Sequence, residues 1–306
     1  MTEFRIGIDL GGTKTEVILL NGDSQELFRT RIPTVRNDYA ATLRDIAGLV
    51  QQAEAAAGQA HLPVGIGIPG TISRKTGCVK NANATWLNGK PFQQDLSGHL
   101  QRPVQMTNDA NCLAVSEAVD GAGRGYDLVF AGILGTGCGA GLVYRGIPLV
   151  GPNGVAGEWG HNPLPWTAAP ELEVRTCYCG KRGCQETFLS GTGLCLSYRL
   201  ASNRELQGHE IVALARARDA LAAQVLDSYI DQLARGLAAI VNVIDPDVIV
   251  LGGGASNIDE IYNRIPERLS RYVFGGECDT PVKRALHGDS SGVRGAAWLN
   301  PLHNPG

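Results

Sequence analysis

The sequence has no long hydrophobic run and no leader-like start. No apolar stretch approaches the roughly 18 residues that are needed to span a bilayer. The first residues, MTEFRIGIDL, lack a basic segment followed by an apolar run, so we expect no signal peptide. These absences predict a cytoplasmic protein without a membrane partner, in which cysteine thiols stay reduced.

A strong charge of one sign is also lacking. The chain carries 27 Lys and Arg residues against 30 Asp and Glu residues, which gives a net charge of -3. A near-neutral mixture of charges gives no electrostatic reason to bind nucleic acid or an anionic membrane. A length of 306 residues, 43% of them hydrophobic, predicts a large core and about two domains.

Glycine, in contrast, is abundant, and the 40 glycines gather in a few places. A strand, a glycine turn and a second strand are predicted over residues 4–22 and again over 128–146. Because these two segments resemble each other, we expect two related lobes that share a cleft, not a short solenoid repeat. The predicted N-terminal lobe covers residues 1–120 and is completed by a helix over 290–306, and the C-terminal lobe covers 121–289.

Other apolar segments supply the remaining predicted elements. Short buried strands are expected within residues 64–70 and 245–254, and a strand, a polar turn and a helix within 104–123. The spacing of Leu, Ala and Ile over residues 211–243 predicts one helix or two. Residues 290–299 predict a short helix with one of its two leading serines near the N-cap.

The first glycine turn, DLGGTK, has the composition of a phosphate-binding loop. Gly11 and Gly12 allow a ligand to approach the backbone closely, while Thr13 and Lys14 offer a hydroxyl and a cation. Successive backbone N–H groups in such a turn form a concave anion site. Asp9 opens the turn at the end of the predicted strand.

The second glycine turn, LGTGCG, offers the same kind of surface through Gly135, Thr136 and Gly137. Neither turn matches the Walker pattern or the dinucleotide-binding G-x-G-x-x-G pattern, because each leads into a second strand and not into a helix. For one turn alone, a plain hairpin is an equally good interpretation. Two matched turns, together with GGG at Gly252 to Gly254, favour a nucleotide clamp.

The polar stretch TNDAN, residues 107–111, joins a predicted strand to a predicted helix. Asp109 could cap this helix while Asn108 adopts a turn, which is the commoner role of an Asn-Asp pair. A carboxylate here could also accept the proton of a hydroxyl that attacks a phosphate. The turn alone leaves both interpretations open.

Three cysteines lie close together in CYCGKRGCQE, as Cys177, Cys179 and Cys184, and His161 lies 16 residues before the first of them. A Cys3His set is an established composition of structural zinc sites. A disulfide is disfavoured in the cytoplasm, and a redox pair would favour a C-x-x-C pattern that is absent here. Isolated core cysteines would not cluster. Because four protein ligands close the site, we expect the zinc to be structural.

Two carboxylates accompany this cluster. Glu158 lies three residues before His161, and Glu186 lies two residues after Cys184. Both could be ordinary solvent-facing glutamates. If the metal loop fixes their positions, however, they are suited to hydrogen bonds with a polyol.

Together these motifs resemble those of the ROK family of bacterial sugar kinases and repressors. The matching stretches are DLGGTK (9–14), NDAN (108–111), GTGCGAG (135–141), GEWGHN (157–162) and CYCGKRGCQE (177–186), and the match covers essentially the whole chain. The resemblance implies an α/β fold with two actin-like, ribonuclease H-like lobes, and ATP and sugar in the cleft between them. Three more stretches, NANATWLNGKPF, AGEWGHNPLPW and HGDSSGVRGAAWL, resemble the bacterial fructokinase (mannofructokinase) branch.

The resemblance implies a role for each matching residue. Asp109 matches the catalytic base and also contacts the sugar. The sugar-binding positions are Asn108, Glu158, His161 and Glu186, and Asn83 is added from its place in NANATWLNG. The nucleotide-binding positions are Asp9, Gly11, Gly12, Thr13 and Lys14, then Gly135, Thr136 and Gly137, and on the adenosine side Gly253 and Gly254. The zinc ligands are His161, Cys177, Cys179 and Cys184, with the other ring nitrogen of His161 turned toward the sugar.

The activity implied is that of an ATP-dependent hexose kinase, specifically a fructokinase that makes fructose 6-phosphate. Mg2+ and the loop amides would neutralise charge on the transferred phosphoryl group. The alternatives are a kinase for mannose, glucose or N-acetylglucosamine, a sugar-binding protein without turnover, and a sugar-responsive repressor. Family repressors carry a helix-turn-helix segment before the first loop, for which a loop that begins at Asp9 leaves no room. Dimers are common in the family, so a homodimer is compatible with the resemblance.

Overall fold

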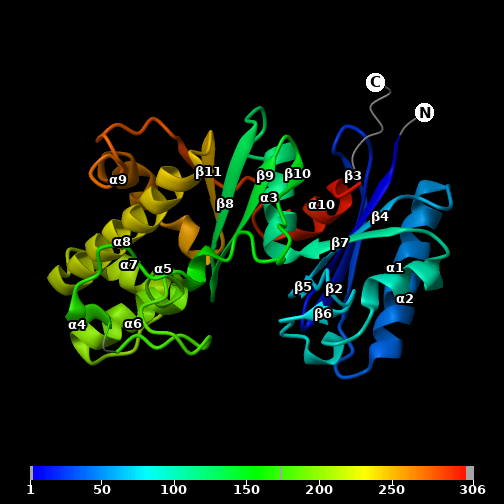
Figure 1. The fold of residues 1–306 in the computed structure, drawn as a ribbon, viewed down its shortest axis with the longest axis horizontal. Coiled ribbons are helices and arrows are strands. Elements are labelled where there is room, and N and C mark those ends of the chain that lie inside the picture. The colour runs from blue at the N-terminus through cyan, green and yellow to red at the C-terminus, as the bar shows by residue number, and fades with distance from the viewer. Residues whose placement is uncertain (1–2, 173, 301–306) are drawn as a thin grey trace. The chain divides into compact units, whose positions relative to one another are not determined.

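Figure 1 shows the computed structural model of the protein, which describes residues 3–172 and 174–300. Contacts between residues divide the chain into two compact units. Unit 1 comprises Met1–Asp127, Gly141–Ala156 and Leu286–Gly306, and unit 2 comprises Leu128–Ala140 and Gly157–Ala285. Each unit is therefore assembled from segments that are distant in the sequence.

This division differs from the predicted lobes chiefly at residues 141–156, which the sequence analysis assigned to the C-terminal lobe. In this segment β10 (Ile147–Pro148) packs against α3 (Asp109–Val119) of unit 1. A Cβ atom on Gly154 would lie 3.0 Å from the hydroxyl of Thr71, which also belongs to unit 1. Of the predicted terminal helix, residues 301–306 lie outside the described part of the chain.

Unit 1 is built on a five-stranded sheet in the order β3-β2-β1-β4-β7. The strands are β1 (Arg5–Leu10), β2 (Lys14–Leu20), β3 (Glu26–Pro33), β4 (Val64–Ile68) and β7 (Val104–Asn108), and a separate pair is formed by β5 (Thr71–Ile72) and β6 (Val79–Lys80). The helices are α1 (Tyr39–Ala57), α2 (Phe92–Leu100), α3 and α10 (Ser291–Trp298). β1 pairs antiparallel with β2 and parallel with β4, and β4 pairs parallel with β7.

The alternation of side chains along β1 separates the two faces of this sheet. Ile6 and Ile8 are fully buried in the core cluster that includes the apolar side of α1. Gly7 points the other way, where an added Cβ atom would lie 2.1 Å from the carbonyl oxygen of Val293 in α10. Glycine at this position lets α10 lie directly on the sheet, and Asp9 shares this face because it is two residues further along the strand.

Unit 2 contains β8, β11, β12 and the start of β9 from a second five-stranded sheet, in the order β10-β9-β8-β11-β12, whose other residues fall in unit 1. Its strands are β8 (Leu128–Leu134), β9 (Cys138–Tyr144), which continues into the segment 141–156, β11 (Val248–Gly252) and β12 (Val282–Arg284). Its helices are α4 (Ala169–Leu172), α5 (Glu186–Leu189), α6 (Gly191–Ser202), α7 (Gly208–Arg216), α8 (Ala220–Ile244) and α9 (Asp259–Leu269). β11 pairs parallel with β8 and with β12. The two sheets therefore follow the same pattern of neighbours.

The predicted helices are confirmed, with one change at a helix start. The region predicted as one helix or two contains α7 and α8, and the side chain of Asp219 caps α8 by accepting a hydrogen bond from Ala222 N. Ser290 is at the N-cap position of α10 but makes no capping hydrogen bond. Its hydroxyl instead accepts from Arg29 at 2.9 Å, while Ser291 donates to the buried carboxylate of Glu117 at 3.0 Å.

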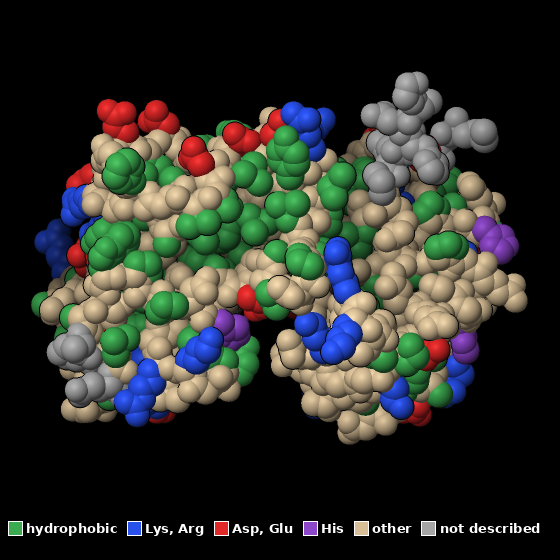
Figure 2. Space-filling view, viewed as in Figure 1, with side chains coloured by type: hydrophobic (Ala, Val, Ile, Leu, Met, Phe, Trp, Pro, Cys, Tyr) green, Lys and Arg blue, Asp and Glu red, His purple; other side chains and the backbone are tan. Residues whose placement is uncertain are grey.

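None of the helices within the described residues is long and apolar enough to cross a membrane. The face drawn in Figure 2 carries both Lys or Arg side chains and Asp or Glu side chains, and neither kind covers it. This distribution agrees with the small net charge of -3.

Candidate active site

The turn between β1 and β2 contains the first predicted phosphate loop. Thr34 donates from its hydroxyl to the carbonyl oxygen of Gly11 at 2.9 Å and from its amide to that of Thr13 at 3.0 Å. Arg36 Nε donates to the carbonyl oxygen of Gly12 at 3.0 Å. In a trans peptide the C=O group points away from the next N–H group. The N–H groups of Gly12 and Thr13 therefore face the opposite side, as an anion site requires.

The two glycines of this loop have different reasons to be glycine. An added Cβ atom on Gly11 would lie 2.8 Å from the carbonyl oxygen of Lys14, which closes the turn by accepting a hydrogen bond from Gly11 N at 2.9 Å. An added Cβ atom on Gly12 would meet no protein atom within 4 Å. Gly11 is thus needed for the turn itself, whereas Gly12 leaves open space in front of the backbone.

Asp9 lies on the α10 face of the sheet, close to the backbone of that helix. A Cβ atom on Gly292 would be 3.3 Å from Asp9 Oδ2. Burial raises the pKa of Asp9 to about 6, and the negative charges of Asp109 and Glu16 act in the same direction, while Lys14 opposes them. A carboxylate that is poorly solvated and close to other acids is stabilised by a bound cation.

Asp109 is the first residue of α3, directly after β7. The side chain of Asn108 is the N-cap and accepts a hydrogen bond from Ala110 N at 2.8 Å, and Asp109 Oδ1 accepts from the same N–H at 2.8 Å. The simplest interpretation of the sequence made Asp109 the cap, but the structure assigns that position to Asn108. Asp109 lies in the first helical turn, where the helix dipole stabilises a negative charge.

Asn83 lies in a loop between β6 and α2 that is closed by Asn88. The Asn88 side chain accepts from Ala82 N at 2.9 Å and donates to Ala82 O at 3.0 Å. The indole N–H of Trp86 donates to the hydroxyl of Thr42 in α1 at 3.2 Å, which anchors the loop to the helix. Asn83 is exposed between the two buried residues of the loop that flank it, so its amide is presented to solvent.

The second glycine loop lies between β8 and β9 in unit 2. Gly135 N donates to Gly137 O at 3.0 Å, and Gly135 O accepts from Gly191 N at 2.7 Å at the start of α6. Gly253, which follows β11, has a φ of 85° and approaches so closely that a Cβ atom would lie 2.7 Å from Leu134 O. The structure therefore brings the second loop and the predicted adenosine-side glycines together.

Glu186 supports the same loop, which the sequence did not indicate. Its Oε2 atom accepts a hydrogen bond from Cys138 N at 3.0 Å. The hydroxyl of Thr192 donates to the carbonyl oxygen of Thr136 at 2.8 Å, and Gly254 begins a 3-10 helix beside the loop. The carboxylate predicted to bind sugar is thereby tied to the backbone of the predicted phosphate loop.

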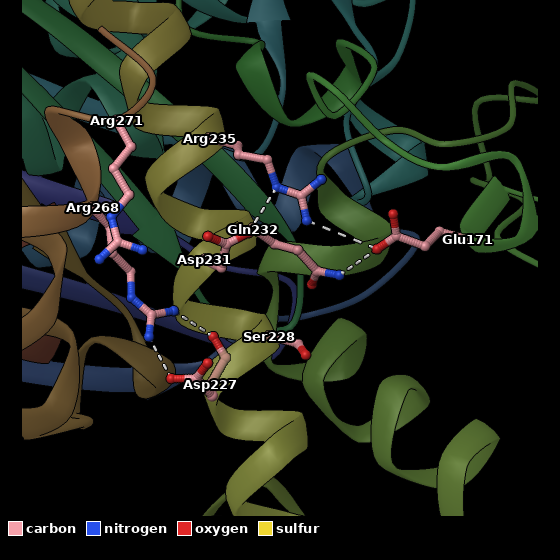
Figure 3. A pocket seen from close by; sticks show the side chains of 8 residues that line it. All are labelled: Glu171, Asp227, Ser228, Asp231, Gln232, Arg235, Arg268 and Arg271. Atoms are coloured by element: carbon pink, nitrogen blue, oxygen red, sulfur yellow. Dashed lines mark hydrogen bonds and ion pairs between the residues drawn. The ribbon is translucent and has the colours of Figure 1, made fainter. Parts of the chain in front are cut away.

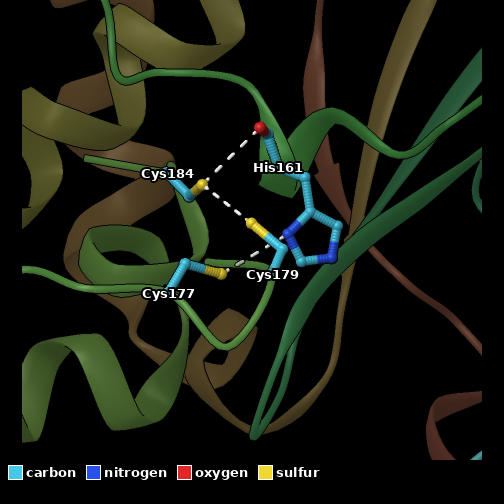
Figure 4. Close-up of side chains that lie close together, drawn as sticks. All are labelled: His161, Cys177, Cys179 and Cys184. Atoms are coloured by element: carbon cyan, nitrogen blue, oxygen red, sulfur yellow. Dashed lines mark hydrogen bonds between the residues drawn. The ribbon is translucent and has the colours of Figure 1, made fainter. Parts of the chain in front are cut away.

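The four predicted metal ligands converge in unit 2, as Figure 4 shows. The ligand atoms of His161, Cys177, Cys179 and Cys184 all lie within 4.8 Å of one another. His161 Nδ1 is 3.5 Å from the sulfur of Cys177, and the sulfurs of Cys179 and Cys184 are 3.6 Å apart. Sulfur ligands about 2.3 Å from zinc stand about 3.8 Å apart in a tetrahedron, so this donor set fits a zinc ion.

The other ring nitrogen of His161 has a partner that the sequence analysis missed. His161 Nε2 lies 3.0 Å from the hydroxyl oxygen of Tyr178, the residue between the first two cysteines of the cluster. Glu158 immediately precedes the 3-10 helix Trp159–His161 and is exposed. The only signal in the sequence for Tyr178 was its place within CYCG.

A pocket of about 240 Å3 lies elsewhere in unit 2, between α4, α8 and α9 (Figure 3). Its lining residues are Glu171, Asp227, Ser228, Asp231, Gln232, Arg235, Arg268 and Arg271. Arg235 is 3.1 Å from Asp231, and Arg268 pairs with Asp227. Because its acids and bases neutralise one another and it has no predicted phosphate loop among its described lining residues, this pocket is not the candidate active site.

The predicted residues are thus divided between the two units. Unit 1 holds Asp9, Gly11, Gly12, Thr13, Lys14, Asn83, Asn108 and Asp109, and unit 2 holds Gly135, Thr136, Gly137, Glu158, His161, Cys177, Cys179, Cys184, Glu186, Gly253 and Gly254. In unit 1 the charges of Asp9 and Asp109 act on each other. We call His161, Cys177, Cys179 and Cys184 the metal-type cluster. In unit 2 Glu186 links the second glycine loop to this cluster, because its Oε2 atom accepts from Cys138 N and its Oε1 atom is 3.7 Å from the sulfur of Cys177.

Two α/β sheets with the same order of neighbours, each with a glycine hairpin, define a protein of the two-lobe, actin-like ATPase class, as predicted. The ROK hexokinase from Thermus thermophilus has this fold, with a TM-score of 0.85, 30% identity and coverage of 97% of both chains. The ROK family glucokinase from Streptomyces griseus, solved in complex with glucose and AMPPNP, has a TM-score of 0.74 and 27% identity over 97% of this chain and 98% of that one.

Sequence comparison gives the family. The model of the ROK family matches residues 5–302. N-acetyl-D-glucosamine kinase of Escherichia coli O1:K1 / APEC is 40% identical over 298 residues, which is 96% of this chain and 98% of the relative. The chain belongs to the ROK family and is a sugar kinase of that family, which confirms the family predicted from the motifs.

Proposed function

We propose that this kinase transfers the terminal phosphoryl group of ATP to a hexose, with fructose as the preferred acceptor and fructose 6-phosphate as the product. The observation that supports fructose as the acceptor is the loop that contains Asn83. Its sequence, NANATWLNG, resembles the fructokinase branch, and the double hydrogen bond from Asn88 to Ala82 gives it a fixed shape. A fixed loop with an exposed amide is suited to the hydrogen-bonded selection of one sugar.

Asp109 is the proposed catalytic base, which accepts the proton of the primary hydroxyl as the phosphoryl group is transferred. Because the side chain of Asn108 caps α3, the helix does not depend on the carboxylate of Asp109 for its cap. Mg2+ bound with ATP supplies charge neutralisation at the phosphates. Asp9 is the acid in unit 1 that would face the cation, because burial leaves its negative charge poorly solvated. The N–H groups of Gly12 and Thr13 bind phosphate oxygens.

Unit 2 carries a second set of proposed binding groups. Its second glycine loop binds phosphate and its Gly253 and Gly254 border the adenosine. His161, with Glu158 and Glu186, binds sugar hydroxyls. A zinc ion held by His161 and the three cysteines would leave no open coordination position, so its proposed role is to hold this loop and not to activate a substrate.

N-acetylglucosamine is the second candidate acceptor. The observation that favours it is the 40% identity to N-acetyl-D-glucosamine kinase over nearly the full length of both chains. Fructose is a ketohexose, whereas N-acetylglucosamine is an aldohexose with an acetamido group at carbon 2, and a hydrogen-bonding site can distinguish the two strongly. The identity of the acceptor therefore depends on a few side chains and has to be measured.

The test is a coupled kinase assay with saturating Mg2+–ATP against fructose, mannose, glucose and N-acetylglucosamine. We expect the highest kcat/KM with fructose, and NMR of the product should show phosphate on the primary hydroxyl at carbon 6. Purified Asp109→Asn protein, assayed in parallel, measures any contaminating kinase. A higher kcat/KM with N-acetylglucosamine than with fructose would overturn the proposed acceptor while leaving the kinase assignment intact.

A further inference from the structure

Tyr178 is an exposed aromatic residue held at a fixed place beside the proposed sugar site. Its side chain is 83% exposed, although its hydroxyl is hydrogen-bonded to His161 Nε2 at 3.0 Å. The two rings meet edge to face, with centroids 5.1 Å apart and planes at 85°. An exposed tyrosine side chain normally keeps its rotational freedom, and the contact with His161 reduces that freedom. This contact therefore suggests a role for Tyr178.

The chain on both sides of Tyr178 belongs to the metal-type cluster. Cys177 and Cys179 are its direct neighbours, and Cys177 N donates to Lys181 O at 2.9 Å, which closes the turn. Two ligands that flank one residue restrict its backbone, and the hydrogen bond to His161 restricts its ring. Tyr178 therefore forms a wall beside His161 Nε2.

One of the proposed sugar-binding acids is close to the residue before Tyr178. Glu186 Oε1 is 3.7 Å from the sulfur of Cys177. Tyr178 therefore contacts His161 directly and follows the cysteine that Glu186 approaches.

We propose that Tyr178 is a specificity-determining residue, which excludes N-acetylated hexoses by filling the space beside His161 Nε2. This inference rests on the proposed function, because it assumes that His161 contacts the sugar. His161 has only one ring nitrogen left after the cluster, and the phenol lies against it. A sugar hydroxyl can join the phenol there, because a hydroxyl group both donates and accepts hydrogen bonds.

An acetamido group has different requirements at that position. It is far bulkier than the hydroxyl that it replaces, and its methyl group can make no hydrogen bond to Nε2. Admitting it would require the Tyr178 ring to leave and would cost the hydrogen bond between the phenol and His161. The wall formed by Tyr178 therefore admits hydroxylated hexoses and rejects those with an acetamido group.

The experiment compares Tyr178→Gly with Tyr178→Phe and with Phe274→Gly. Tyr178→Gly removes the wall, and Tyr178→Phe keeps the ring without its hydroxyl. Phe274 is 94% exposed in unit 2 and belongs to no proposed site, so it controls for the loss of an exposed aromatic residue. Each protein is assayed with fructose and N-acetylglucosamine, and binding of N-acetylglucosamine is measured by calorimetry without nucleotide. Zinc content and thermal unfolding show whether each variant is folded.

We expect Tyr178→Gly to raise the ratio of kcat/KM for N-acetylglucosamine to that for fructose by about tenfold or more, and to make binding of N-acetylglucosamine measurable. The ratio should stay close to wild type in Tyr178→Phe and in Phe274→Gly. An unchanged ratio in folded, zinc-containing Tyr178→Gly would overturn the role of Tyr178 alone. A wild-type protein that already prefers N-acetylglucosamine would overturn the proposed acceptor and this inference together.

Discussion

Replacing Asp9 by asparagine should stabilise the protein at neutral pH while impairing its activity. The pKa of Asp9 is raised from 3.8 to about 6, chiefly by burial and then by the charge of Asp109. The folded state therefore holds this proton more tightly than the unfolded state does. Stability is highest below the unfolded pKa and falls as the pH rises through the folded pKa.

The size of the effect follows from the same two pKa values. At about 1.36 kcal/mol per pKa unit, the ionised Asp9 lowers the free energy of unfolding by about 3 kcal/mol above pH 6. The neutral side chain in Asp9→Asn avoids this loss. We expect the variant to be up to about 3 kcal/mol more stable than wild type at pH 7.5, and roughly half as much at pH 5. Turnover should fall, because the amide offers no charge to a cation.

The assay is urea denaturation at both pH values, without nucleotide or Mg2+. Asp120→Asn is the matched control. Burial alone would raise the pKa of Asp120, but hydrogen bonds from His287 and Arg294 lower it to about 2. That variant should therefore lose about 2.5 kcal/mol at pH 7.5, the opposite sign. If Asp9→Asn were no more stable than wild type at pH 7.5, or gained equally at both pH values, the reasoning from burial would be refuted.

Three further predictions concern the proposed site. Asp109→Asn should keep the fold and lower kcat by roughly 10²–10⁴, and a wild-type kcat would show that Asp109 only supports α3. Gly12→Val puts a side chain into the open space before the first loop, so calorimetry should show weaker ATP binding, and unchanged affinity would remove the loop from the site. Purified protein should contain about one zinc ion per chain, and Cys179→Ser should lower zinc content and raise KM for the sugar more than KM for ATP. Full activity of metal-free protein would contradict the structural role of zinc.

Local signals in the sequence predicted the hairpins and the metal-type cluster. Glycine directly after a buried strand allows the backbone to turn tightly, so DLGGTK and LGTGCG could be interpreted as strand, turn and strand. The convergence of the three cysteines could also be predicted, because metal ligands that are close in sequence need only a short loop to come together. The strand and the helix around Asn108 were also predicted, but the capping interpretation named Asp109, whereas the structure gives the cap to Asn108.

The sequence by itself thus determined the elements, the family and the list of candidate residues, because each depends on neighbours along the chain. Only the tertiary structure decided what surrounds them. The need for glycine at position 7 is explained by the close approach of α10, which begins at Ser291. The place of Glu186 is explained by its hydrogen bond from the amide of Cys138, which is distant in the sequence. The pKa of Asp9 and the contact of Tyr178 with His161 likewise depend on groups that folding brings together. Burial, charge and the space beside a side chain are properties of the packed molecule, which a pattern of residues does not contain.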